Sequence, residues 1–181
     1  MGIALRTPRL LLREWREEDI DRFVSLLADP EVTAMLPPLP DRAACAAWIA
    51  RMRAHNDTHG FAYWAVELPE EAPLVGAIGL TRVNFRDAFG EAVEIGWRLA
   101  RSYWGRGYAT EAARAAIDDG FYRLDIPEIV AFTVPFNRAS RAVMERLEMT
   151  RDPADDFDFH RFEEGHPLRR HVLYRIRREV L

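Results

Sequence analysis

Hydrophobic and polar residues follow two periods along this chain, one typical of strands and the other of helices. Runs that alternate between apolar and polar side chains, or stay apolar, predict strands at residues 10–13, 61–68, 74–83, 92–99, 128–134 and 170–177. Apolar side chains that recur every three to four residues predict helices at 16–28, 41–55, 108–124 and 137–147. The acidic segment 152–164 is predicted as a loop or a short strand.

Turn and capping residues separate these elements. Prolines break the chain at residues 37–40, and Asp41 can then cap the second helix, as Asn137 can cap the fourth. Residues 69–73 read as a turn that joins two strands into a hairpin, and residues 84–90 read as a loop.

The order of the elements predicts the fold class. The connection from Leu99 to Glu128 contains a helix, and a crossover of this kind joins two parallel strands. The other connections favour antiparallel pairing. We therefore expect an α+β protein with a mostly antiparallel sheet of six to seven strands, flanked by about four helices, with residues 1–181 in a single domain.

The composition agrees with one globular domain. The chain has 181 residues, of which 49% are apolar and 30% are charged, and a domain of this length needs no disulfide or metal to fold. Cys45 is the only cysteine, so no intrachain disulfide can form. The longest near-continuous apolar run, residues 43–50, is far shorter than a membrane span, and residues 1–8 lack the apolar stretch of a signal peptide. We therefore expect a cytoplasmic protein.

Arginine supplies every fixed positive side-chain charge. The 25 residues counted as Lys or Arg are all Arg. A P-loop, a protein kinase and a Schiff-base or pyridoxal enzyme each require a Lys, so the sequence excludes these classes. The formal net charge of −4 disfavours a general nucleic-acid binder.

The region most informative about chemistry joins a strand to a helix. Gly105-Arg106-Gly107 follows the strand at 92–99 and opens the helix at 108–124. Glycines let the backbone approach a ligand, and the first turn of a helix offers unpaired N–H groups that suit a pyrophosphate. Two other interpretations stay open. The glycines either make only a tight turn or belong to the dinucleotide motif G-x-G-x-x-G, although Thr110 stands at its third glycine position.

This stretch resembles the signature of the GNAT superfamily of acyl-CoA-dependent N-acyltransferases. That signature is Gln or Arg, two residues, Gly, one residue, and then Gly or Ala. Trp104-Gly105-Arg106-Gly107-Tyr108-Ala109 matches from its fourth position on, with Trp in place of the usual Gln or Arg. This substitution, Thr110-Glu111-Ala112 and the segments 7–13 and 137–149 resemble the RimJ/RimL branch, which acetylates the N-termini of ribosomal proteins.

The resemblance implies a fold and a cofactor. The sheet would splay between the strands at 92–99 and 128–134, and the pantetheine arm of acetyl-CoA would lie in that gap. Backbone N–H groups of residues 105–110 would hold the pyrophosphate, and the N–H of Leu99 would polarise the thioester carbonyl. The cofactor-binding residues that it implies are Trp97, Leu99, Trp104, Gly105, Arg106, Gly107, Tyr108, Ala109, Thr110, Asn137 and Ser140.

The resemblance also directs the search for an acid and a base. Many GNAT enzymes use a Tyr seven residues after the Asn as the acid, but this chain has Met144 there. We expect Ser140 to substitute, with a small polar residue on a helix face as the alternative. We expect Glu94 to act as the base, although it shares a strand face with Arg98, so a structural ion pair or an ordered water is the alternative. The family usually has Gly where Glu148 stands, so the end of that helix is expected to be built differently.

The other titratable side chains show no motif for a metal or a nucleophile. His55 and His59 lack the Glu of H-E-x-x-H, and we expect them at the solvated surface. His160 or His166 can line an acceptor pocket. If the acidic pairs at 70–71 and 155–156 rim the cleft, they would attract a cationic acceptor.

Together these observations predict an acetyl-CoA-dependent N-acetyltransferase. The acetyl group would pass directly to a primary amine, either a protein N-terminus or a small molecule, without a metal and without a covalent enzyme intermediate. We expect neither a nucleic-acid nor a membrane partner, and the sequence leaves open whether the protein is a monomer or a homodimer. Two alternatives stay open: a non-catalytic acyl-CoA- or nucleotide-binding module, and an NAD(P)-binding enzyme.

Overall fold

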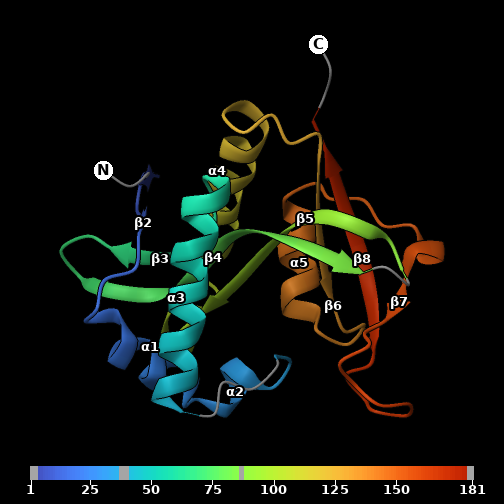
Figure 1. The fold of residues 1–181 in the computed structure, drawn as a ribbon, viewed down its shortest axis with the longest axis horizontal. Coiled ribbons are helices and arrows are strands. Elements are labelled where there is room, and N and C mark those ends of the chain that lie inside the picture. The colour runs from blue at the N-terminus through green and yellow to red at the C-terminus, as the bar shows by residue number, and fades with distance from the viewer. Residues whose placement is uncertain (1–3, 37–40, 86–87, 179–181) are drawn as a thin grey trace.

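The computed structural model describes residues 4–36, 41–85 and 88–178. Its strands form a sheet in the order β1-β2-β3-β4-β5-β6-β8-β7 (Figure 1). The strands are β1 Leu5–Arg6, β2 Leu11–Arg13, β3 Tyr63–Leu68, β4 Ala72–Phe85, β5 Gly90–Leu99, β6 Glu128–Thr133, β7 Phe157–Asp158 and β8 Arg170–Arg177. The helices are α1 Asp19–Leu27, α2 Pro30–Thr33, α3 Arg42–His59, α4 Tyr108–Tyr122 and α5 Arg138–Arg146, with 3-10 turns at Arg101–Tyr103 and Pro153–Asp155.

The structure confirms the predicted α+β class and refines its boundaries. Among the described residues the sheet has eight strands instead of six to seven, because β1 and β7 have two residues each and are too short to show a period. The loop expected at 84–90 is shorter, since β4 continues to Phe85, which pairs with Gly90. The helix that Asp41 caps continues to His59, where Gly60 ends it with φ 77°. The break expected at 37–40 lies outside the described residues.

Helices cover both faces of the sheet (Figure 1). Successive side chains of a strand point to opposite faces, so each strand contributes to two cores. The core on one face packs α4 against Leu80 and Ile95, and the core on the other face packs α1 and α3 against Ala65 and Ala77. Within the described ranges, no helix is both long enough and apolar enough to cross a membrane.

The sheet splays between β5 and β6, as expected. These strands form the only parallel pair among the described strands, and it contains just two register pairs, Val93 with Ile129 and Glu94 with Val130. Beyond Glu94, β5 pairs only with β4, and β6 pairs only with β8. A dinucleotide-binding fold would need a run of parallel strands, so this topology argues against the NAD(P) alternative.

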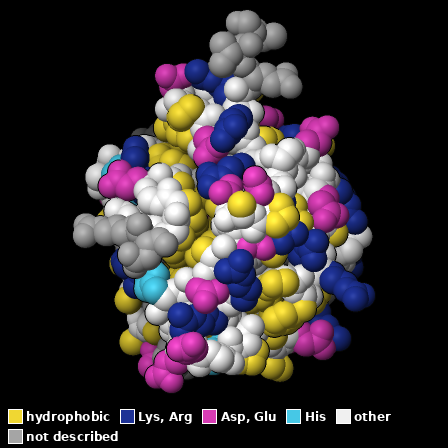
Figure 2. Space-filling view, turned by 90° about the vertical axis from the view of Figure 1, so that its right-hand side faces the viewer, with side chains coloured by type: hydrophobic (Ala, Val, Ile, Leu, Met, Phe, Trp, Pro, Cys, Tyr) yellow, Lys and Arg dark blue, Asp and Glu magenta, His cyan; other side chains and the backbone are white. Residues whose placement is uncertain are grey.

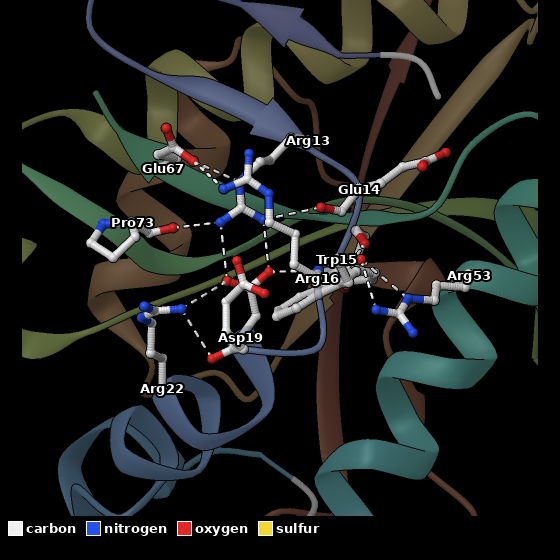
Figure 3. Close-up of polar contacts among 11 residues, drawn as sticks. Arg13, Glu14, Trp15, Arg16, Asp19, Arg22, Arg53, Glu67 and Pro73 are labelled. Carbon is white, nitrogen blue, oxygen red and sulfur yellow. Dashed lines mark hydrogen bonds and ion pairs between the residues drawn. The ribbon is translucent and has the colours of Figure 1, made fainter. Parts of the chain in front are cut away.

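A buried ion cluster joins α1 to strands β2, β3 and β4 of the sheet (Figure 3). Arg13 donates two hydrogen bonds to the Asp19 carboxylate, at 2.7 and 3.0 Å, and one to Glu67, at 2.6 Å. Its other two bonds go to the carbonyls of Glu14 and Pro73. All five N–H donors of the guanidinium therefore have acceptors.

The end of α5 adopts a backbone that normally requires glycine. Glu148 has φ 63°, although it stands where the GNAT family usually has Gly. Its N–H donates to the carbonyl of Glu145 at 3.0 Å, and the N–H of Met149 donates to the carbonyl of Met144 at 3.1 Å. These two bonds make a Schellman motif, so the helix ends in a left-handed turn despite the substitution.

Candidate active site

The glycine segment forms the N-terminal end of α4. Gly105 and Gly107 have φ 72° and φ 79°, in the left-handed region that favours glycine. The N–H of Glu111 donates to the carbonyl of Gly107 at 3.0 Å, which leaves the N–H groups of residues 108–110 without a helical partner. A Cβ at Gly105 would meet nothing within 4 Å, so the loop is open on that side. This geometry suits a bound anion.

The N-terminal segment holds this loop in place. The Arg9 side chain donates to Glu111 at 2.7 Å and to the carbonyl of Arg106 at 2.9 Å, and the Thr7 hydroxyl donates to Glu111 at 2.6 Å. The Arg9 guanidinium also lies 4.5 Å from the centroid of the Tyr108 ring. The Tyr108 side chain is therefore buried, and only its backbone is available to a ligand in the loop.

The edge of β5 that faces the gap carries free backbone groups. The N–H of Ala100 donates to the carbonyl of Val75 in β4 at 2.9 Å. Because N–H groups alternate between the two edges of an antiparallel strand, those of Leu99 and Trp97 point toward the gap. The Leu99 carbonyl accepts a bond from the Trp104 indole at 2.8 Å. The fold thus brings these three predicted residues together at the gap.

The first turn of α5 lies across the gap. The Asn137 side chain accepts a bond from the N–H of Ser140 at 3.2 Å, which confirms the predicted helix cap, and donates to the Thr133 hydroxyl at 2.9 Å. Met144 is buried one turn further along and has no proton to donate. Ser140 is therefore the hydroxyl that α5 offers at this position.

A cavity of about 700 Å³ opens where β5 and β6 part. Thr133, Asn137, Ser140 and Met144 line it on the side of β6 and α5. Its other walls come from α3, β3, β4, β5, β8 and the segments that follow α2 and β7; they include Leu36, Trp48, His55, Tyr63, Glu94, Phe159 and His171. The glycine segment 105–107 does not line this cavity, because it lies beyond the C-terminal end of β5.

Glu94 is half-buried in the cavity wall, at the last parallel register pair. The Tyr63 hydroxyl occupies the space above Gly96, since a Cβ there would lie 1.7 Å from it. Burial raises the pKa of Glu94 to about 7, although the charges of Arg98 and Arg161 and a hydrogen bond from Tyr63 lower it. No ion pair within 4 Å joins Glu94 to Arg98 in the described part of the chain. A carboxyl with this pKa can accept a proton near neutral pH.

His55 does not lie at the solvated surface, contrary to the prediction. Its Nε2 accepts the backbone N–H of Arg82 at 3.1 Å, so its Nδ1 carries the hydrogen that is donated to the carbonyl of Phe61 at 2.7 Å. Burial lowers the pKa of His55. The ring is a neutral bridge between α3 and β4.

The cavity wall differs from the prediction in two further ways. The histidine of its C-terminal part is His171, which β8 carries, and neither His160 nor His166 lines it. The acidic pairs 70–71 and 155–156 do not rim it either. Sequence reasoning missed the residues of α3, β3 and β4, because their place around the cavity depends on the tertiary fold.

Comparisons with known proteins bear on this arrangement. A family model described as "Acetyltransferase (GNAT) domain" matches residues 9–150. YkkB of Bacillus subtilis (strain 168) is 31% identical over 146 residues, which cover 80% of this chain and 84% of YkkB. The ribosomal protein uS5-alanine N-acetyltransferase of Escherichia coli (strain K12) is 28% identical over 151 residues, or 80% of this chain and 77% of that one. The structure of RimL, a ribosomal L7/L12 alpha-N-protein acetyltransferase in complex with coenzyme A, has a TM-score of 0.79 at 16% identity and covers 97% and 98% of the two chains.

Proposed function

This chain belongs to the GNAT acetyltransferase family and is an acetyl-CoA-dependent N-acetyltransferase, and we propose that it acetylates a primary amine by direct attack on the thioester, with Glu94 as the base. The observation that carries this proposal is the position of Glu94. Its carboxyl lines the cavity at the point where the sheet splays, and burial raises its pKa to about 7.

The cofactor would extend from the glycine loop into the gap. The free N–H groups at residues 108–110 and the exposed side chain of Arg106 support binding of the pyrophosphate there. The free edge of β5 offers the N–H groups of Trp97 and Leu99 to the pantetheine arm and the thioester carbonyl. RimL, which has the same fold, is in complex with coenzyme A, which supports acetyl-CoA as the cofactor of this chain.

The reaction needs a neutral amine and a protonated leaving group. A lysine-type amine with a pKa of about 10.4 is neutral in about 1 of 2,500 molecules at pH 7, and an N-terminal amine in roughly 10–15%. Glu94 would take the proton that the nitrogen loses as it attacks the carbonyl carbon. The tetrahedral intermediate then collapses, the C–S bond breaks, and Ser140 or a water protonates the thiolate, whose conjugate thiol has a pKa of about 8.5.

Release of the CoA thiol in the presence of an amine library tests this proposal. The wild-type rate should rise with pH through about 7, as Glu94 ionises, and Glu94→Gln should lose this rise. Gly107→Glu should abolish the melting-temperature increase that acetyl-CoA gives, without unfolding the protein. If acetyl-CoA binds but no amine releases the thiol, the proposed direct transfer to a primary amine is wrong.

A further inference from the structure

Arginine side chains gather around the cavity. Arg51 of α3, Arg82 of β4, Arg98 of β5 and Arg161 all line it, and Glu94 is the only carboxylate among the described lining residues. The whole chain has the opposite balance, with a net charge of −4. Figure 2 shows charges of both signs interspersed on one outer face. The cavity therefore concentrates positive charge in a protein that is acidic overall.

These four arginines lack the carboxylate partners that many other arginines of the chain have. None of them lies within 4 Å of a carboxylate that the structure describes. Two lie on aromatic rings instead: Arg98 is 5.1 Å from the Trp48 ring centroid, and Arg161 is 5.5 Å from that of Phe159. Stacking orients a guanidinium but leaves its in-plane N–H donors available to a ligand.

Arg98 is the most informative of the four, because it is half-buried. A buried charge without an ionic partner costs free energy, and a bound anion would offset that cost. Glu94 and Arg98 lie on the same face of β5, on either side of Gly96, and the Tyr63 hydroxyl fills the space above that glycine. One small molecule can therefore present an amine to Glu94 and an anion to Arg98.

We propose that the acceptor is a small primary amine that also carries a carboxylate or a phosphate. This inference rests on the proposed function, since it names the acceptor class of the same site. The amine lies at Glu94, and the anionic group binds Arg98 with help from Arg51, Arg82 or Arg161, since arginine pairs bidentately with both anions. The cavity of about 700 Å³ has the size of a small-molecule site.

The same charges disfavour the cationic acceptor that the acidic pairs would attract if they rimmed the cleft. An acceptor with several amino groups would bring further positive charge to four arginines. Nearby positive charge also lowers the pKa of a bound amine, which increases its reactive neutral fraction. The arginines thus select for the anionic group and activate the amine at once.

Matched acceptor pairs test the proposal through thiol release from acetyl-CoA. Free L-amino acids are compared with their amides, and O-phosphoethanolamine with ethanolamine. In at least one pair, the acceptor that carries the carboxylate or phosphate should have a kcat/KM about tenfold or more above that of the acceptor without this group, which we call its neutral twin. The amine of an amino-acid amide is less basic, so this bias works against the expected result. Equal or higher kcat/KM values for the neutral twins, or for spermidine, would overturn the proposal.

Variants locate the anion site. Loss of the Arg98 charge raises the pKa of Glu94 further and so slows both acceptors, but Arg98→Gln should reduce the ratio of kcat/KM for the anionic acceptor to that for its neutral twin about tenfold or more. Arg161→Gln, at an exposed position, should show the same selective loss and serves if the Arg98 variant does not fold. Arg146→Gln is the control, because this exposed arginine of α5 does not line the cavity. Parallel losses for both twins would contradict an anion site.

Binding separates this proposal from the proposed function. If no amine releases the thiol, the transfer reaction is wrong, and the melting temperature of the CoA-saturated protein then decides the acceptor class. The anionic twins should raise that temperature more than the neutral ones, because they bind only the folded state. Equal shifts would refute the anion site whatever the activity.

Discussion

Two groups that combine arginine and carboxylate side chains in this protein have opposite properties. In the cluster of Figure 3, Arg13 pairs with the fully buried Asp19, and all five of its N–H donors have acceptors. In the cavity, Arg98 and Glu94 share a strand face but form no ion pair, and burial raises the pKa of Glu94 to about 7. A saturated cluster stabilises the fold, whereas an unsaturated one keeps hydrogen-bonding capacity and a labile proton for a ligand.

Removal of the Glu94 carboxylate should give the largest effect, and it acts on catalysis. Glu94→Gln keeps the shape but removes the base, so kcat/KM at pH 8 should fall about 10²–10⁴-fold. Thiol release with a saturating amine measures it. Glu91→Gln is the matched control, since Glu91 lies exposed on the same strand. If the kcat/KM of Glu94→Gln lies within about twofold of wild type, water and not Glu94 accepts the proton that the amine loses.

The same variant should gain stability, which no change in the Arg13 cluster should do. Burial raises the pKa of Glu94, so its ionisation costs the folded state free energy as the pH rises from the ordinary carboxyl range to about 7. Glu94→Gln removes this cost. Its melting temperature should exceed that of wild type at pH 8, and the difference should shrink toward pH 5. A lower melting temperature of Glu94→Gln at pH 8 would show instead that Glu94 stabilises the fold, as the side chains of the Arg13 cluster do.

Removal of one partner in the saturated cluster should cost stability instead. Asp19→Ala leaves the Arg13 guanidinium buried without its main carboxylate, which should lower the free energy of unfolding by about 3–5 kcal/mol. Urea unfolding measures the loss, and kcat/KM should stay near wild type wherever the protein remains folded. Asp21→Ala is the control, because its pair with Arg42 is exposed and should contribute less than about 1 kcal/mol. Equal losses in both variants would remove the distinction between the two groups.

The sequence predicted features that depend on neighbouring residues better than contacts between side chains of different segments. The helix caps Asp41 and Asn137 and the glycine segment 105–107 were found because each depends on a few neighbouring residues. The alternation of β5 correctly placed Glu94 and Arg98 on one face, but it could not show whether they form an ion pair, because a strand pattern fixes direction and not side-chain distance. The arginine-lined cavity needs four separate segments and was invisible in the sequence.

The pair of Glu111 with Arg9 tests whether an ion pair outside the cavity can affect the active site by holding the glycine loop in place. Glu111 joins Arg9 to the glycine loop, so Glu111→Gln should weaken acetyl-CoA binding roughly tenfold and leave kcat at saturation nearly unchanged. Titration calorimetry with acetyl-CoA measures the affinity. Asp119→Asn breaks a pair with Arg123 at the other end of α4 and should not alter it. If kcat falls and the affinity does not, Glu111 acts on the reaction and not on the loop.

The smallest predicted effect concerns Glu148, a carboxylate that belongs to neither group. Its φ of 63° strains any residue with a Cβ, and its pair with Arg114 is long, at 3.5 Å, and exposed. Glu148→Gly removes the strain and should raise the free energy of unfolding by about 1 kcal/mol, since the lost ion pair contributes little. Urea unfolding compares it with Glu148→Ala, which loses the ion pair but keeps the Cβ and should gain nothing. Because Glu148 neither pairs with a buried charge nor faces the cavity, kcat/KM should not change in either variant. A stable but slower Glu148→Gly enzyme would instead connect the end of α5 to the placement of Ser140 at its beginning.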